Sequence, residues 1–197
     1  MFKETSKELL EFLSKSPTAF HAVENYRQIL NADGFKELLE SEHWDIVPGG
    51  KYYVTRNNTS ILAFKVGTKL DNYSFNIVTS HTDSPTFKVK ENAEIEVKNK
   101  YTQLNTEGYG GMLCATWLDR PLSIAGRVLV SEGNSIVTKL LNIDRDLLMI
   151  PNVAIHMNRA ANDGFKYNLQ VDMLPLLSGG DDRQKDFKQI IMWFCLY

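Results

Sequence analysis

The chain has 197 residues, 43% of them hydrophobic, so it can bury a substantial core and hold one or two domains. Its formal net charge of −2 at pH 7 gives no reason to expect nucleic acid or an acidic membrane surface as a partner. The amino terminus lacks a basic region followed by an apolar run, and no apolar stretch is long enough to cross a bilayer, which argues against a secretory signal and a membrane span.

Two helices are predicted at the start of the chain. Residues 3–14 place three leucines on one side at helical spacing, with Lys and Glu elsewhere. Thr18 is suited to cap a second helix with a clean apolar face, and Gly34 is suited to end it in the left-handed conformation. We interpret His21, on the first turn of that helix, as structural or solvent-facing, because nothing nearby completes a site.

Strands are predicted next. Residues 52–56 and 60–66 are joined through Asn57-Asn58-Thr59, where asparagine tolerates the positive φ of a tight hairpin. After a polar loop, residues 75–78 form an apolar, partly β-branched run suited to a buried strand. Helices, hairpin and buried strand are typical of a three-layer α/β/α domain, of which residues 1–85 would be an incomplete N-terminal part, because further strand–helix crossovers do not follow.

A His-x-Asp motif, His81 and Asp83, follows the predicted buried strand. Open α/β sheets bind ligands at the carboxyl ends of their strands. A neutral imidazole is a good zinc ligand, and a nearby carboxylate fixes its tautomer and raises its basicity. Two interpretations follow from the spacing alone. The pair could cap a turn, or it could supply one ligand of a metal site that needs others.

From Thr86 onward the pattern changes to strict alternation of polar and apolar residues, which indicates half-exposed antiparallel strands. The sequence therefore predicts a second, mostly β domain over residues 86–197, with Gly133-Asn134 as one of its turns. Its expected strands cover residues 86–91, 94–98, 127–130, 135–141, 147–150 and 153–157. The glycines at 108–111 lack the strand–loop–helix context and the Lys of a phosphate loop, so nucleotide binding is not expected.

Several stretches of the chain resemble one known family. The segment Ser80-His81-Thr82-Asp83-Ser84-Pro85 resembles the first metal-binding motif of the M18 aspartyl aminopeptidases, which are dinuclear zinc exopeptidases. Four further stretches resemble the same family in the same order, and together the five cover the chain from about Phe2 to Leu177. They are residues 16–23, 52–57, 109–128 and 151–156.

The resemblance implies an enzyme that releases an amino-terminal residue, often Asp or Glu, from a peptide substrate with two zinc ions. It implies that His81 is a ligand to one zinc and that Asp83 orients its imidazole. It also implies a homo-oligomer formed through the β-rich domain, in which His156 reaches the neighbouring subunit's active site to contact substrate or stabilise an oxyanion. From the residues alone, His156 in its apolar segment is usually a satisfied core or interface group. The family places Asp119-Arg120 in the dimerisation domain without a metal ligand, so we interpret it as a local ion pair or hydrogen-bonding pair.

Family members continue beyond the last matching stretch, through the part that carries the bridging Asp, the Glu general base and the remaining ligands. We therefore expect a truncated or frameshifted chain, with a natural short paralogue as the alternative. A catalytic zinc holds about three protein ligands plus water, and only His81 lies in a recognisable motif. We expect the chain alone to bind zinc weakly and not to hydrolyse peptides. The competing hypothesis is a non-catalytic assembly module that associates through the β domain, His156 and the apolar terminus at residues 190–197.

The chain has two cysteines, Cys114 and Cys195, which are far apart in the sequence and sit in apolar surroundings. Such residues are more often reduced, buried thiols than disulfide partners. Together with the lack of a signal segment, this predicts a cytoplasmic protein.

Overall fold

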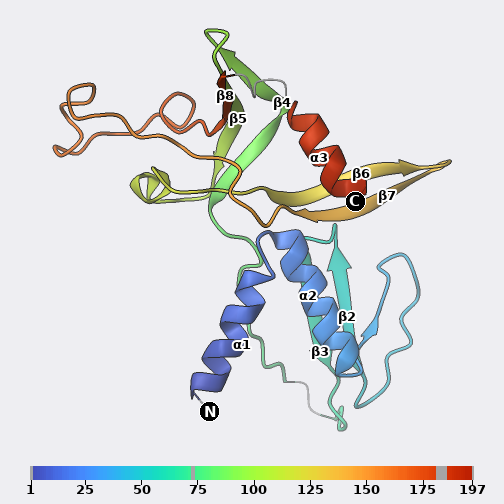
Figure 1. Ribbon diagram of the computed structural model, residues 1–197. Helices are drawn as coiled ribbons and strands as arrows, with labels where there is room; N and C mark the ends of the chain where they lie inside the picture. The colour runs from blue at the N-terminus through green and yellow to red at the C-terminus, as the bar shows by residue number, and fades with distance from the viewer. Residues whose placement is uncertain (1, 72–73, 181–185, 197) are drawn as a thin grey trace. The chain divides into compact units, whose positions relative to one another are not determined.

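The computed structural model describes residues 2–71, 74–180 and 186–196 (Figure 1). The chain divides into two compact units. The first contains Met1–Ser84 and Gly126–Leu140, and the second contains Pro85–Ala125 and Leu141–Tyr197. The main division thus lies beside residue 85, while the hairpin of residues 126–140 groups with the first unit. The assignment of 1–85 and 86–197 as separate domains stays a prediction.

Two helices open the first unit, as predicted. α1 spans Phe2–Ser14 and α2 spans Ala19–Ala32. Thr18 caps α2, since its Oγ1 accepts a hydrogen bond from the backbone N–H of His21 at 3.5 Å. Gly34 follows the helix with φ +80°, the left-handed conformation that glycine adopts without strain. Thr18 and Gly34 therefore mark the start and the end of α2, as the sequence predicts.

A three-stranded sheet follows the two helices in this unit. β1 (Lys36–Glu37) pairs in parallel with β2 (Lys51–Arg56), and β2 pairs antiparallel with β3 (Ser60–Lys65). The predicted β2–β3 hairpin is confirmed. The central strand β2 supplies three of the buried side chains of the unit, and α2 supplies two. The buried set is Ala22, Val23, Tyr52, Tyr53 and Val54.

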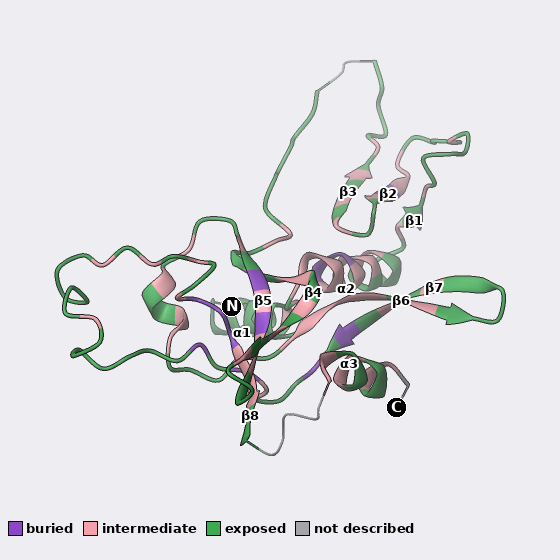
Figure 2. Cartoon of the chain, turned by 90° about the horizontal axis from the view of Figure 1, so that it is seen from above, coloured by how far each residue is buried: buried purple, intermediate pink, exposed green. Residues whose placement is uncertain are grey.

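The predicted buried strand at residues 75–78 is wrong for this chain. Residues 74–81 have no strand assignment, and Phe75 and Val78 are 82% and 97% exposed. Figure 2 shows this stretch as an exposed loop between β3 and β4. A buried strand requires neighbouring strands to pair its backbone and other layers to cover its faces. No described residue pairs with the segment, so its apolar side chains face solvent.

The second unit is built on an antiparallel sheet in the order β4-β5-β8. These strands are Thr86–Val97, Tyr101–Tyr109 and Leu176–Gly179. Two separate strands were expected at 86–91 and 94–98, but the chain forms the single strand β4, whose register against β5 shifts between Val89 and Glu94. The irregularity explains the break in the alternating pattern. The core of the unit includes Leu104, Thr106, Ile143, Ile150 and Met173.

The remaining elements are a 3₁₀ turn, a hairpin and a helix. The turn η1 covers Cys114–Trp117, the hairpin pairs β6 (Ala125–Glu132) with β7 (Ser135–Asn142), and α3 covers Phe187–Leu196. Gly133 in the hairpin turn has φ +62°, which confirms the predicted turn. The predicted strand at 147–150 forms only isolated bridges, which join Leu148 to Leu122, Met149 to Leu176 and Ile150 to Leu118.

Two further properties concern the described residues as a whole. Cys114 and Cys195 are both free, as predicted, but they are half-buried rather than buried. Among residues 2–71, 74–180 and 186–196, no helix combines the length and apolar character that a membrane span needs.

His21 predicts a pH dependence of stability. Its Nδ1 lies 2.8 Å from Thr18 Oγ1, and burial lowers its pKa below the usual 6.5. The unfolded chain therefore binds this proton more readily than the folded chain. The stability contributed by neutral His21 is complete above pH 6.5 and is lost as the pH falls through the lower, folded-state pKa.

We expect the melting temperature of the wild type to fall more than that of His21→Gln as the pH is lowered from 7.5 to 5.5. Circular dichroism melts of the two proteins in matched buffers measure this difference. Parallel pH profiles for the two proteins would contradict the assignment.

Candidate functional site

The candidate metal ligand His81 is paired with Asp83, as the sequence predicts. His81 Nδ1 lies 3.0 Å from Asp83 Oδ1, and the two side chains are 91% and 36% exposed. When the imidazole is neutral, a hydrogen bond from Nδ1–H to this carboxylate leaves the lone pair of Nε2 directed away from the pair. The arrangement is the one that a carboxylate-oriented metal ligand requires.

Local geometry explains why these two side chains meet. The backbone bends at Thr82, between the two residues. The Oγ1 of Thr82 donates a hydrogen bond of 2.7 Å to the backbone oxygen of Thr59 at the end of the β2–β3 turn. The hairpin therefore anchors the loop, and His81 and Asp83 stay accessible.

The chain contains a second His-x-Asp pattern that serves as an internal comparison. His43 Nε2 lies 3.7 Å from Asp45 Oδ1, beyond hydrogen-bond distance, and both side chains are almost fully exposed. His43 is therefore a solvent-facing side chain. The same spacing of residue types therefore produces a close Nδ1 contact at one place and a loose Nε2 contact at the other.

A complete metal site is not present in the part of the chain that the structure describes. No group of three or more His, Cys, Asp or Glu side chains there is placed to hold a metal ion. A catalytic zinc typically needs about three protein ligands, whereas His81 with Asp83 supplies one ligand and the group that orients it. These residues fit one part of a zinc site and do not fit a whole one.

His156 lies in the second unit, in a turn. The strand predicted at 153–157 is wrong, because the backbone N–H of Met157 bonds to the oxygen of Ala154 at 2.8 Å and closes a turn. His156 and its apolar neighbours Val153 and Ile155 are all exposed, so no partner strand or core layer within the described chain holds them in a sheet. The catalytic role of His156 stays a prediction.

Asp119 holds the start of the segment that leads to His156. Its Oδ1 accepts a hydrogen bond of 2.8 Å from the backbone N–H of Asn152, and its own N–H donates to the oxygen of Ile150 at 3.0 Å. Asp119 has φ +54°, a conformation that Asp tolerates better than most residues. Arg120 donates instead to the oxygen of Thr116 at 3.1 Å. The two residues thus bond to other parts of the chain, and the sequence interpretation missed Asp119 as a loop anchor.

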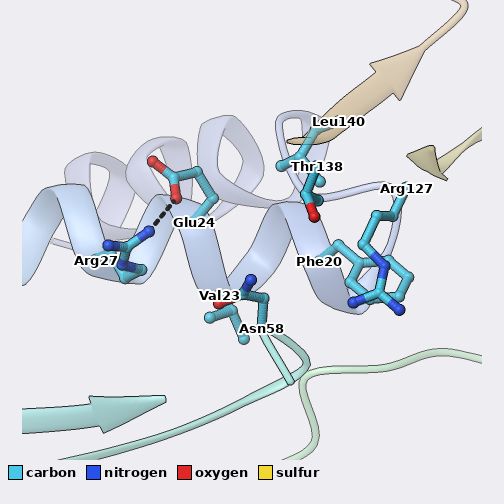
Figure 3. Close-up of a pocket in the computed structure, with 8 residues that line it drawn as sticks. All are labelled: Phe20, Val23, Glu24, Arg27, Asn58, Arg127, Thr138 and Leu140. Atoms are coloured by element: carbon cyan, nitrogen blue, oxygen red, sulfur yellow. Dashed lines mark hydrogen bonds and ion pairs between the residues drawn. The ribbon is translucent and has the colours of Figure 1, made fainter. Parts of the chain in front are cut away.

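Sequence reasoning also missed a pocket in the first unit, drawn in Figure 3. Its volume is about 150 Å³, and its lining combines one stripe of α2 with residues from the β2–β3 turn and the β6–β7 hairpin. The residues are Phe20, Val23, Glu24, Arg27, Asn58, Arg127, Thr138 and Leu140. The i, i+3, i+4, i+7 spacing on α2 was readable from the sequence, but the other residues come from distant segments.

Histidines that bind metals commonly donate their other ring N–H to a carboxylate, the arrangement of His81 and Asp83. Comparison with known proteins specifies the class. Residues 12–190 match the family model described as aminopeptidase I zinc metalloprotease (M18). The chain belongs to the M18 family of zinc aminopeptidases, as the resemblance implied.

Individual relatives agree. A probable M18 family aminopeptidase 2 of Clostridium novyi is 49% identical over 90% of this chain and 42% of its own length. An aspartyl aminopeptidase of Dictyostelium discoideum is 46% identical over 88% of this chain and 36% of its own. The chain thus spans less than half the length of these relatives.

Solved structures show the same fold. The cryo-EM structure of the Ape4 and Nbr1 complex matches with a TM-score of 0.86 and 39% identity, over 94% of this chain and 36% of that one. The S. cerevisiae mApe1 dodecamer matches with a TM-score of 0.72 and 26% identity, over 92% and 40% respectively. The predicted α/β class is therefore confirmed, and the chain corresponds to part of the M18 fold.

The His81–Asp83 contact predicts a particular imidazole tautomer. While the Asp83 carboxylate accepts a hydrogen bond from Nδ1–H, neutral His81 should carry its proton mainly on Nδ1. We expect Asp83→Ala to reduce the Nδ1–H form to a minority. Long-range ¹H–¹⁵N NMR at pH 8 measures the two forms directly.

Asp45→Ala is the matched control, and we expect it to leave the tautomer balance of His43 unchanged, because the 3.7 Å contact involves Nε2 and exceeds hydrogen-bond distance. An unchanged His81 tautomer in Asp83→Ala would show that the carboxylate does not orient the ring.

Proposed function

We propose that this chain is the His81-bearing part of an M18 aminopeptidase that removes an amino-terminal residue, often acidic, from a peptide with two zinc ions. The observation that carries the proposal is the 3.0 Å contact between His81 Nδ1 and Asp83 Oδ1 on an accessible loop. The aspartyl aminopeptidase of Dictyostelium discoideum supports the acidic preference. Free Cys114 and Cys195 suit the reducing cytoplasm, where we place the protein.

Each proposed site residue has a distinct role. His81 would bind one zinc through Nε2, and Asp83 would hold the ring in the tautomer that presents this nitrogen. His156 would act at the active site of a neighbouring subunit, with Asp119 holding the segment that carries it. Bound zinc supplies Lewis acidity in such sites. The described residues alone do not complete the site, so we propose that the isolated chain binds zinc weakly and does not hydrolyse peptides.

Zinc titration and a peptidase assay test this proposal. We expect the purified chain to bind Zn²⁺ with a Kd weaker than about 10 µM, since a single imidazole lacks the other two or three ligands of a closed site. His81→Ala should weaken binding further by about fivefold or more, whereas the matched control His43→Ala should change it by less than about twofold. Isothermal titration calorimetry measures all three proteins.

The same proteins are then assayed on aspartyl and glutamyl aminoacyl substrates with added Zn²⁺. We expect no turnover above the metal-only blank. Turnover that His81→Ala abolishes would overturn the proposed inactivity and establish His81 as catalytic. Equal zinc affinities for the His81 and His43 variants would instead show that His81 is not a zinc ligand.

A non-catalytic assembly module is the second candidate function. Two observations favour it. Met192 and Trp193 on α3 expose large apolar side chains in the β-rich unit, and the related mApe1 of S. cerevisiae forms a dodecamer. In this function the chain would associate with itself or with a full-length family member through the β-rich unit.

Light scattering with size-exclusion chromatography tests the second function. We expect a dimer or larger species at about 50 µM, a concentration that populates interfaces of micromolar Kd. Met192→Glu should shift the population toward monomer, because it places a charge in the apolar contact. Gln189→Glu adds the same charge at an exposed polar position of α3 and should leave association unchanged. A strictly monomeric wild type that also does not bind a full-length M18 enzyme would contradict the assembly role.

A further inference from the structure

The pocket of the first unit has a charged end that the peptidase chemistry does not use. The guanidinium of Arg127 lies over the ring of Phe20, with its central carbon 4.4 Å from the ring centroid (Figure 3). Its Nη1 donates to both the backbone oxygen and Oδ1 of Asn57, each at 3.2 Å. Phe20 thus contacts one face of the guanidinium, and Asn57 binds one of its three nitrogens.

The remaining donors of Arg127 form a fork. With Nη1 bonded to Asn57, the nitrogens Nε and Nη2 are left along one side of the planar group, the geometry that accepts a carboxylate through two parallel hydrogen bonds. No described residue accepts a hydrogen bond from either nitrogen, and no described carboxylate forms an ion pair with Arg127. Arg127 therefore presents an uncompensated charge in a fixed orientation.

Two more donors line the same pocket. The hydroxyl of Thr138 on β7 and the side-chain amide of Asn58 in the β2–β3 turn make no hydrogen bond to the described part of the chain. Figure 3 shows Thr138 above α2 near Phe20, and Asn58 beside Val23. These two groups and Arg127 come from three separate segments, so the fold brings three unused donor side chains to one cavity.

The other two charged residues of the pocket, Arg27 and Glu24, form an ion pair with each other, and Arg27 Nε makes no hydrogen bond within the described chain. Arg27 donates to Glu24 at 3.1 Å and to Glu37 at 2.8 Å, and Glu24 also accepts a hydrogen bond from Gln28 at 3.2 Å. Glu24 is therefore occupied and does not compete for Arg127. The charge that a ligand meets in the pocket is positive and comes from Arg127.

The rest of the lining is apolar and favours a ligand with a hydrocarbon group. Phe20, Val23 and Leu140 contribute hydrocarbon surface, and the volume of about 150 Å³ matches a cavity that holds a benzene-sized group. We propose that this pocket binds a small organic monocarboxylate with a branched apolar group, its carboxylate on the Arg127 fork and its apolar end against α2. The carboxylate could belong to a free acid or to the terminal residue of a peptide.

This site is separate in its residues from His81 and Asp83, so its test does not depend on the proposed peptidase function. Isovalerate is the probe for a free acid, and N-acetyl-leucine is the probe for a peptide terminus. Titration of the ¹⁵N-labelled chain, followed by NMR shifts, should show saturable binding of at least one probe with a Kd of about 1 mM, a value within the efficiency of so small a ligand. Binding of isovalerate alone identifies the free acid as the source, and tighter binding of N-acetyl-leucine identifies the peptide terminus.

An uncharged probe and two protein variants test the roles of the carboxylate and of the residues proposed to bind it. Isovaleramide has the same shape without the charge and should bind about tenfold more weakly. Arg127→Lys keeps the charge but loses the two parallel donors, and should weaken binding of the acid probe about tenfold. Thr138→Val removes one donor at nearly constant volume and should weaken it about threefold. Circular dichroism confirms that each variant is folded.

Lys139→Gln is the matched control, because Lys139 lies beside Thr138 in β7, carries a positive charge paired with Glu132, and is not part of the pocket lining. We expect it to change the affinity by less than about twofold. Absence of saturable shifts with either acid, equal binding of isovaleramide, or equal losses in Arg127→Lys and Lys139→Gln would each overturn the proposal.

Discussion

The first unit depends on a tight turn between β2 and β3 in which two consecutive asparagines adopt positive φ. Asn57 and Asn58 have φ of 52° and 53°, and the N–H of Thr59 bonds to the oxygen of Arg56 at 3.1 Å, which closes the turn. Asparagine adopts positive φ more readily than most residues other than glycine.

The residues of this turn also make contacts beyond the hairpin. Asn57 fixes Arg127, Asn58 lines the pocket, and the backbone oxygen of Thr59 anchors the His81 loop. Asn is one of the few residue types that allows both the backbone conformation and the side-chain contacts. The same short turn therefore supports the candidate metal ligand and the pocket.

The contrast between the two His-x-Asp patterns shows what such a motif does and does not specify. Around His43 the intervening Trp44 bonds within its own loop, from Nε1 to the backbone oxygen of Leu39 at 2.8 Å, and the imidazole and carboxylate lie 3.7 Å apart. Around His81 the intervening Thr82 bonds to the β2–β3 hairpin, and the flanking pair lies 3.0 Å apart. The same spacing of residue types therefore gives different contacts at the two places, and the pattern alone does not specify which one forms.

Sequence reasoning succeeded where the determining signal is local. The Thr18 cap, the glycine after α2, the Asn57-Asn58 turn and the Gly133 turn depend on the conformational preferences of single residues, and all are present. It failed for residues 75–78 and 153–157, because an apolar run becomes a strand only when partners pair its backbone. The pair His81–Asp83 was predicted from the resemblance to a family motif, because the same spacing at His43 and Asp45 gives no hydrogen bond. The pocket was not, because Asn58, Arg127 and Thr138 meet only after the hairpins have formed.

The exposed stretch at residues 74–81 has a consequence for the sensitivity of the chain to proteases. Within the described part of the chain, its backbone N–H and C=O groups join no sheet and no turn, and its apolar side chains point outward. An extended, unpaired backbone is the shape in which proteases bind their substrates, through strand-like hydrogen bonds. The segment that presents the candidate zinc ligand therefore also has the backbone geometry that a protease requires of its substrate.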